Sequence, residues 1–276
     1  MTTTAPHRAT ETDPLRSVTH FPHWESATAE EILTEALSRW GRRVAIGTAF
    51  QAEGMAILDM AVRIDPGVRV FTIDTGRLPA ESHHFIDEVR RHYGIEVEVQ
   101  LPRPGDVEPL VQRFGTDLFR ESVDLRLACC RARKVEPLAR RLADLDAWIT
   151  GLRRDQAPSR AGVPKAGIDP HHPGVIKLSP LADWNAHDVA SYLTRHAVPR
   201  HPLYARGYSS IGCAPCTRPT LLGADTRSGR WWWEDEQPKE CGLHWGPDGS
   251  LTRHNESTDR KEDLQGTNSD VPIKRS

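Results

Sequence analysis

The fold of this chain is decided by the stretch Arg43-Val44-Ala45-Ile46-Gly47-Thr48-Ala49-Phe50-Gln51-Ala52-Glu53-Gly54. Its first five residues are mostly apolar and predict a buried strand, whereas the small residues from Thr48 to Gly54 predict a loop. An apolar helix is expected next, through Met55, Leu58 and Met60. The stretch therefore predicts a strand, a loop and a helix in direct succession.

The same alternation continues along the chain. Further strands are expected at residues 68–73, 95–99, 147–150 and 175–178, and helices at 28–41, 79–93, 107–114, 131–143 and from Asn185 onward. Strands and helices that alternate over short connections predict an α/β fold, in which helices flank a mostly parallel sheet. Ligands of such folds lie beyond the carboxyl ends of the strands, where residues 47–54 and the turn at 74–77 are both expected.

The composition predicts a soluble globular protein. Hydrophobic residues make up 38% of the 276 residues, charged residues make up 27%, and the formal net charge is −2. This balance gives no general attraction to nucleic acid or to an anionic membrane, so neither partner is expected. The sequence shows no secretory signal and no apolar run near the ~20 residues that span a bilayer. Residues 1–22 and 246–276 are polar and without periodicity, and we expect both to be disordered.

The chemistry of the chain is expected at its five cysteines. Four of them form two close pairs, Cys129-Cys130 and Cys213-Ala214-Pro215-Cys216, and the fifth, Cys241, stands apart. This arrangement is a poor disulfide framework and favours a reducing cytoplasm. Four thiolates match an iron–sulfur cluster, in which each thiolate binds its own iron, or a tetrahedral zinc ion. A redox dithiol and ordinary buried thiols remain as alternatives, and Lys134 lies four residues after Cys130.

Cys241 has the sequence surroundings of a reactive thiol. His244 lies three residues later, and four basic residues are near in the sequence, namely Arg218, Arg227, Arg230 and Lys239. Such neighbours lower the pKa of a thiol, although an ordinary exposed cysteine fits the same pattern. Arg153 and Arg154 follow a predicted strand, where guanidinium groups favour phosphate or sulfate. A single arginine is more often a solvated surface charge.

Four motifs occur together in this chain. They are Cys129-Cys130-Arg131-Ala132-Arg133-Lys134-Val135-Glu136-Pro137-Leu138, Ser210-Ile211-Gly212-Cys213-Ala214-Pro215-Cys216-Thr217, Arg230-Trp231-Trp232-Trp233-Glu234 and Lys239-Glu240-Cys241-Gly242-Leu243-His244. With supporting matches at residues 72–77, 151–156 and 179–184, they resemble the motifs of assimilatory adenylyl-sulfate (APS) reductases. These enzymes are the cluster-bearing branch of the phosphosulfate reductase family. The resemblance spans residues 25–245.

The resemblance implies a fold like that of the adenine-nucleotide alpha-hydrolases and PP-loop proteins. Residues 23–222 would form the α/β domain, and residues 223–245 a mobile C-terminal segment with the catalytic cysteine. One 4Fe–4S cluster per subunit would be bound by Cys129, Cys130, Cys213 and Cys216. Cys241 would be the nucleophile, assisted by His244 and Lys134. The substrate contacts would be Gly47, Thr48, Ala49, Phe50, Asp74, Thr75, Gly76, Arg153, Arg154, Arg227 and Arg230. Gly54 departs from the family pattern, because many relatives carry an acidic residue there.

The substrate that the resemblance implies is adenosine 5′-phosphosulfate, and the electron donor is thioredoxin or a glutaredoxin-like protein. The Cys241 thiolate would displace AMP and form an S-sulfocysteine, from which the donor releases sulfite. Plant-type members carry a fused thioredoxin-like domain that this sequence does not show, so a separate donor is expected. The family also allows a homo-oligomer. The alternatives are a 3′-phospho-APS reductase and a zinc-stapled nucleotide-binding protein in which Cys241 is idle.

Overall fold

A six-stranded sheet forms the centre of the computed structural model, which describes residues 22–221 and 223–234. The strands lie in the order β3-β2-β1-β4-β6-β5. Their bounds are Val44–Gly47 for β1, Val70–Ile73 for β2, Val97–Gln100 for β3, Ala147–Ile149 for β4, Ala166–Ile168 for β5 and Ile176–Leu178 for β6. Only β5 runs antiparallel to its neighbour among these strands. The carboxyl ends of β1, β2 and β4 therefore meet at one edge of the sheet.

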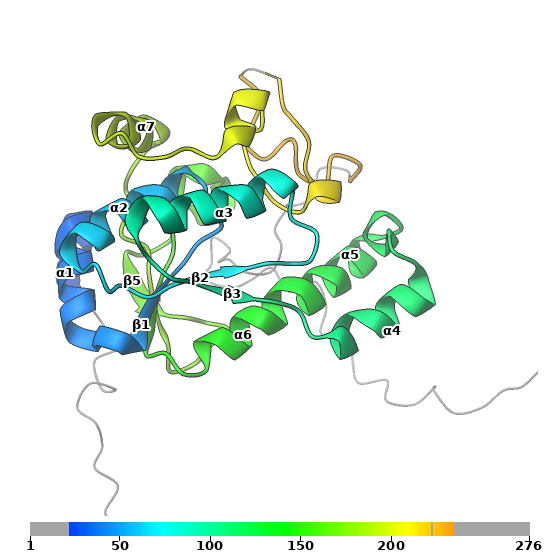
Figure 1. Cartoon of the computed structure of the whole chain (residues 1–276), viewed down its shortest axis with the longest axis horizontal. Helices are drawn as coiled ribbons and strands as arrows, with labels where there is room; N and C mark the ends of the chain where they lie inside the picture. The colour runs from blue at the N-terminus through cyan, green and yellow to red at the C-terminus, as the bar shows by residue number, and fades with distance from the viewer. Residues whose placement is uncertain (1–21, 222, 235–276) are drawn as a thin grey trace, which may run out of the picture.

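Helices cover both faces of the sheet (Figure 1). They are α1 Ala29–Trp40, α2 Ala52–Ile64, α3 Ala80–Tyr93, α4 Pro104–Phe114, α5 Val123–Cys130, α6 Glu136–Leu142 and α7 Ala186–Arg195. Successive side chains of a strand point to opposite faces, so Val44 and Ile46 pack in the core with α1, α2, α3 and α7. Ala45, between them, packs against Leu138 and Leu142 of α6. This alternation gives the sheet a core on each side.

Local signals set several helix ends. Thr28 and Glu31 form a capping box at the start of α1, and Asn185 caps α7. Gly94 ends α3 with a left-handed backbone, at a φ of 66°. The parallel sheet, the flanking helices and these ends confirm the predicted fold class.

Three elements differ from the sequence-based prediction. The pair Cys129-Cys130 ends α5, an eight-residue helix too short to show a clear apolar period. The predicted helix at 131–143 begins as a π-helical turn over Arg131–Val135 and continues as α6. β5 is a three-residue edge strand formed by pairing with β6, and its residues carry no strand pattern of their own. All three depend on tertiary contacts.

The predicted chain ends lie outside the described residues. Residues 1–21, 222 and 235–276 are not described, so neither the predicted disordered ends nor Cys241 and His244 have a structural account. Within the described part of the chain, no helix is both long and apolar enough to cross a membrane.

Candidate active site

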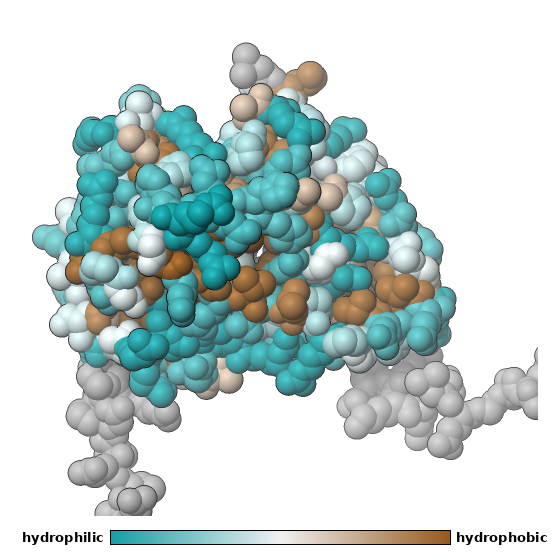
Figure 2. Space-filling view, in the orientation of Figure 1, coloured by the Kyte–Doolittle hydropathy of each residue, from teal (hydrophilic) through white to brown (hydrophobic). Residues whose placement is uncertain are grey.

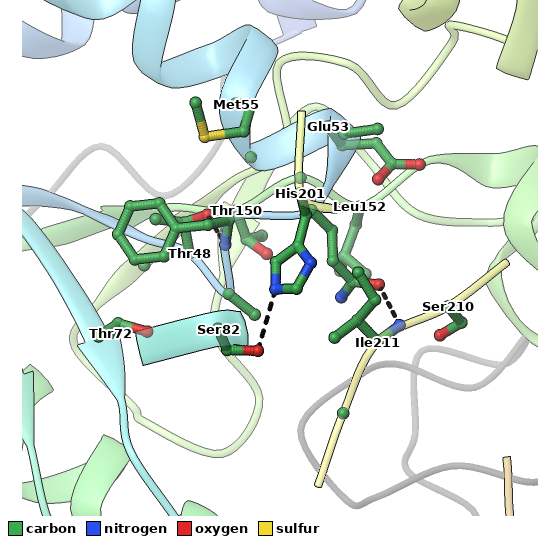
Figure 3. A pocket seen from close by; sticks show the side chains of 18 of the residues that line it. Thr48, Glu53, Met55, Thr72, Ser82, Thr150, Leu152, His201, Ser210 and Ile211 are labelled. Atoms are coloured by element: carbon green, nitrogen blue, oxygen red, sulfur yellow. Dashed lines mark hydrogen bonds between the residues drawn. The ribbon is translucent and has the colours of Figure 1, made fainter. Parts of the chain in front are cut away.

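A cavity of about 610 Å³ opens at the carboxyl ends of β1, β2 and β4 (Figure 3). Residues 47–55, 71–73, 150–153 and 209–213 form most of its wall. Among the predicted site residues, those that line it are Gly47, Thr48, Ala49, Phe50, Thr75, Lys134, Arg153, Cys213, Arg227 and Arg230. Asp74, Gly76 and Arg154 are not part of the wall.

Residues 48–54, which comprise the loop after β1 and the first turn of α2, are called the nucleotide loop below, after the role that the resemblance implies for them. Thr48 Oγ1 accepts a hydrogen bond of 2.9 Å from the backbone N–H of Phe50, which is buried and has a φ of +54°. A Cβ atom on Gly54 would lie 2.1 Å from Thr48 Oγ1. Any larger residue at this position would therefore collide with the threonine.

Ion pairs bind the loop after β4 to the nucleotide loop. Arg153 Nη2 lies 2.9 Å from Glu53 Oε1, and Arg153 also pairs with Asp155. Gln156 Nε2 donates to the same Glu53 oxygen over 3.0 Å. Gly151 permits this approach, because a Cβ atom there would lie 2.8 Å from the Cβ atom of Glu53. The charge of Arg153 is therefore compensated within the protein.

Two predicted substrate contacts have other partners. Arg154 Nη2 lies 2.6 Å from Glu25 Oε2, and its Nε donates to the carbonyl oxygen of Val163. The side chain of Asp74 accepts from the N–H of Gly76 and lies 2.9 Å from His83 Nε2. Arg154 thus joins two loops, and Asp74 joins the turn after β2 to α3.

The four paired cysteines come together from two distant parts of the chain. Cys129 and Cys130 end α5, and Cys213 and Cys216 bracket a short 3₁₀ turn at Ala214–Cys216. All four are buried and free of disulfide bonds, and they share an apolar cluster that includes Leu118, Phe119 and Trp231. The N–H of Ala214 donates to the carbonyl oxygen of Arg77 over 2.8 Å, which holds this loop beside the turn after β2.

The surroundings shift the pKa values of these thiols in different directions. Burial opposes ionisation of Cys213, but the Lys134 ammonium and Thr75 Oγ1, 3.2 Å from the sulfur, outweigh it and lower the pKa of this thiol. Burial raises the pKa of Cys129, and it raises that of Cys216 to about 11. Further thiolates at this site need additional positive charge, which metal ions supply.

The four buried thiols are the donor set of an iron–sulfur cluster, in which each thiolate binds its own iron. Among the described residues, no three or more His, Cys, Asp or Glu side chains are arranged to hold one metal ion. The indole N–H of Trp231 is buried in the cluster of the four thiols and has no hydrogen-bond partner among the described residues. An acceptor such as a cluster sulfur would satisfy it.

Cationic side chains gather where the cavity meets the cysteines. Lys134, Arg227 and Arg230 line the wall there, and Arg160 lines it beside Gln156. Arg230 is 5% exposed, and its buried Nε has no hydrogen-bond partner among the described residues. Gly212 makes room for this guanidinium, because a Cβ atom there would lie 2.5 Å from its central carbon. A buried arginine nitrogen without an acceptor at a cavity wall indicates an anionic ligand.

The sequence did not predict two side chains that join residues 204–211 to the nucleotide loop. Gln51 Oε1 accepts a hydrogen bond of 2.8 Å from the N–H of Ile211, and the Tyr204 hydroxyl accepts one of 3.1 Å from the N–H of Ala52. Both side chains line the cavity. Their partners lie more than a hundred residues away, so no local pattern could reveal them.

His201 is a further missed residue of the wall. Its Nδ1 accepts from the N–H of Leu203, so its Nε2 carries the proton and donates to Ser82 Oγ over 3.0 Å (Figure 3). Burial lowers the pKa of His201 to about 4, which keeps the ring neutral at physiological pH. The arrangement makes His201 a fixed, uncharged part of the cavity.

Comparisons with known sequences found similar proteins over most of the chain. A family model described as phosphoadenosine phosphosulfate reductase domain matches residues 43–219. The adenosine 5′-phosphosulfate reductase of Allochromatium vinosum is 45% identical over 84% of this chain and 89% of that protein. A probable 5′-adenylylsulfate reductase 1 of Oryza sativa subsp. japonica is also 45% identical, and the match covers 80% of this chain and 48% of that protein.

Comparisons with solved structures support the same fold. The phosphoadenylyl-sulfate (PAPS) reductase of Candida auris, in a phosphate complex, has a TM-score of 0.59 and 27% identity, over 69% of this chain and 90% of that chain. An FMN adenylyltransferase of Candida glabrata, with a TM-score of 0.51 and 17% identity over 84% of this chain and 73% of that chain, shares the fold alone. These matches confirm the predicted fold and the resemblance. The chain therefore belongs to the phosphoadenosine phosphosulfate reductase family, a family of oxidoreductases.

Proposed function

We propose that this protein reduces adenosine 5′-phosphosulfate to sulfite and AMP in sulfate assimilation, with electrons from thioredoxin. One observation carries the proposal: four buried thiols lie beside a cavity whose wall holds Lys134, Arg227 and Arg230. An anionic nucleotide needs such cations. The relatives named adenosine 5′-phosphosulfate reductase support this substrate.

Cys129, Cys130, Cys213 and Cys216 would hold one 4Fe–4S cluster. When bound, the cluster would offset part of the charge of the four thiolates and add rigidity at this end of the cavity. Trp231 would donate its buried N–H toward it, and Lys134 would lie between it and the substrate. Loss of any one of these thiols should then lower the iron content.

The nucleotide would lie along the nucleotide loop. The buried Phe50 and Leu152 supply apolar surface for a purine ring, and the backbone N–H groups at the start of α2 face an anion favourably. The sulfate end would lie toward Arg227 and Arg230. Attack of an anion on an anionic centre is opposed by repulsion, which these two cations and Lys134 would offset.

The bond changes follow from this placement. The Cys241 thiolate forms a bond to the sulfate sulfur, the bond from that sulfur to the phosphate oxygen breaks, and AMP leaves with that oxygen. His244 would donate to a sulfate oxygen or assist the leaving group. A thioredoxin thiolate then attacks the Cys241 sulfur and releases sulfite, and its second thiol resolves the mixed disulfide. The two electrons that reduce the sulfur come from the thioredoxin dithiol.

The domain organisation is part of the proposal. Residues 23–222 would bind the nucleotide and the cluster, and residues 223–245 would carry Cys241 as a mobile segment. A cytoplasmic location and a separate thioredoxin or glutaredoxin-like donor agree with five cysteines that do not suit a disulfide framework. Assembly into a homo-oligomer is compatible with this scheme.

The test is sulfite release by anaerobically purified protein with reduced thioredoxin, on APS and on its 3′-phosphorylated form in parallel. A strong preference for APS is expected. The PAPS reductase of Candida auris among the similar structures makes the 3′-phosphorylated substrate the second candidate. Preference for that substrate would keep the chemistry and change the specificity. Absence of sulfite from both, with iron and sulfide present, would overturn the enzyme assignment.

A further inference from the structure

A buried ion pair joins α5 to the end of the described chain. Arg126 Nε of α5 donates to Glu234 Oε1, and the two side chains are 3% and 6% exposed. Arg126 belongs to the helix that ends in Cys129-Cys130, whereas Glu234 is the last described residue before the segment with Cys241. The pair thus connects a cysteine-bearing helix with the root of the segment proposed to carry the nucleophile.

Residues 231–234, the root of this segment, are also held by backbone hydrogen bonds and by a ring contact. The N–H of Trp231 donates to the carbonyl oxygen of Cys216 over 3.2 Å, and the N–H of Glu234 donates to the carbonyl oxygen of Trp231 over 3.0 Å. The Arg126 guanidinium lies 4.4 Å from the centre of the Trp231 ring. Residues 231–234 are therefore fixed between the two pairs of cysteines.

A buried ion pair fixes the relative position of its two residues more reliably than it stabilises the fold. Removing both charges from water costs about as much as their attraction returns, but the hydrogen bond between them is directional. Cys241 lies 241 − 234 = 7 residues beyond the fixed point. Seven residues reach at most ~25 Å when extended and span about 15 Å on average when flexible. The position of Glu234 therefore limits where the Cys241 thiol can be.

We propose that the Arg126–Glu234 pair anchors the root of the C-terminal segment, and that both are positioning residues for the attack of Cys241. This inference rests on the proposed function. While the pair is formed, the root is fixed and the Cys241 thiol has a high effective concentration near the cavity. When the pair is broken, the same thiol samples a larger volume, and its effective concentration falls. Neither residue of the pair lines the cavity wall.

The first test is Glu234→Gln in the cluster-loaded, full-length protein. We expect sulfite release per enzyme to fall about 10-fold at saturating APS, because the effective concentration of the thiol falls. The KM for APS and the iron content should stay within about twofold of the wild type. Trypsin cleavage after Arg230, a buried residue, should accelerate because the root opens more often. The cleavage rate is independent of catalysis.

The matched control is Glu98→Gln, which weakens another carboxylate pairing of a buried arginine, that of Arg141, away from the cavity. It should leave turnover and the cleavage after Arg230 unchanged. If Glu234→Gln behaves like this control in both measurements, the anchor does not exist. If both variants lower turnover and accelerate cleavage equally, the effect is one of general stability and the positioning role is wrong.

A second variant distinguishes a positioning role of the pair from the free-energy cost of leaving one of its charges buried without a partner. Arg126→Met with Glu234→Leu removes both charges and should restore the melting temperature, while turnover stays low because no directional bond fixes the root. Full recovery of turnover in this double variant would overturn the proposal. Failure of the proposed function is recognised separately, because the wild-type protein would then release no sulfite from APS, whatever the anchor variants do.

Discussion

The nucleotide loop and the cysteine region meet at one cavity but satisfy their polar groups differently. The cysteine region comprises α5 and residues 209–234. In the nucleotide loop, Glu53 accepts from both Arg153 and Gln156, and Thr48 accepts from a backbone N–H. In the cysteine region, Arg230 Nε and the indole N–H of Trp231 are buried without hydrogen-bond partners among the described residues. The polar groups of the first region are thus paired by described neighbours, whereas two donors of the second are not.

The hydropathy of the surface shows that buried charged side chains are the minority. Figure 2 shows a mostly hydrophilic face over the helices, with apolar side chains in an interrupted band across the middle of the molecule. Most polar and charged side chains thus lie in water, and the buried ones include Arg153 beside the nucleotide loop and Arg126 and Arg230 in the cysteine region. Substitutions in the cysteine region should therefore lower turnover first, and substitutions in the nucleotide loop should lower stability first.

The largest effect is expected at Cys241, which extends the cysteine region beyond the described residues. Cys241→Ser should reduce sulfite release by at least about 1,000-fold, because the thiolate is the group that bonds to sulfur. Iron content and the melting temperature should remain those of the wild type. The measurement is single-turnover sulfite release with iron analysis of the same samples. Appreciable residual turnover would remove Cys241 from the mechanism.

Lys134→Ala should reduce turnover by about 100-fold, the usual cost of one lost electrostatic contact in a transition state. The ammonium lowers the pKa of Cys213 and lines the cavity, so its charge acts on both sides of the site. Iron content should fall far less than turnover. Parallel losses of iron and turnover would recast Lys134 as a residue that only supports the thiols. Lys134→Arg is the control that keeps the charge.

Glu53→Gln tests the nucleotide loop. It leaves the buried Arg153 with one carboxylate partner, the more exposed Asp155, and should lower the free energy of unfolding by about 3 kcal/mol. Chemical denaturation of the purified protein measures this change. Asp155→Asn is the matched control and should cost less, because Asp155 is the more exposed of the two carboxylates. A larger loss for Asp155→Asn would show that the buried pair is not what holds the two loops together.

Protonation of Asp169 at low pH should lower the folding stability through its contact with the cavity wall. Trp148 lines the cavity and donates to Asp169 Oδ2 over 2.9 Å. Burial alone would raise the pKa of Asp169, but the hydrogen bond from His172 and the charge of Lys177 lower it from 3.8 to about 2. Because the folded pKa lies below the unfolded one, the stabilisation is complete above pH 4. It is lost as the pH falls to 2, by about 2 kcal/mol.

The measurement for Asp169 is the free energy of unfolding between pH 5 and pH 2. In Asp169→Asn, the part of the pH dependence that comes from this carboxyl should disappear. An identical slope in both proteins would assign the acid sensitivity to other carboxylates.

The smallest effect is expected for Gly54→Ala. The added methyl group collides with Thr48 Oγ1, and overpacking of this kind costs about 1–3 kcal/mol. Alanine in place of glycine within a helix returns about 1 kcal/mol, so a net loss of about 1 kcal/mol is expected. Thr48→Ala combined with Gly54→Ala should recover stability, since the hydroxyl is gone. A double variant no more stable than Gly54→Ala would mean that the backbone, and not the threonine, excludes the methyl group.

Much of the fold followed from local pattern. The buried run at Val44–Gly47, the capping box at Thr28 and the stop at Gly94 all operate within a few residues, and each has its predicted place. The cavity at the carboxyl ends of the strands follows from the parallel order of the sheet. The helix α5 and the strand β5 did not follow, because both are short and owe their form to neighbours.

The candidate site divides in the same way. The sequence by itself determined the residue types: paired cysteines, a lysine four residues after one pair, and arginines near the second. It did not separate Arg153, whose charge is compensated by Glu53, from Arg230, whose Nε has no acceptor in the described part of the chain. Only the tertiary structure decided this, and it also brought Gln51 to Ile211, Tyr204 to Ala52 and Glu234 to Arg126. The physical reason is that burial and charge compensation depend on partners a hundred or more residues away, which a local pattern does not contain.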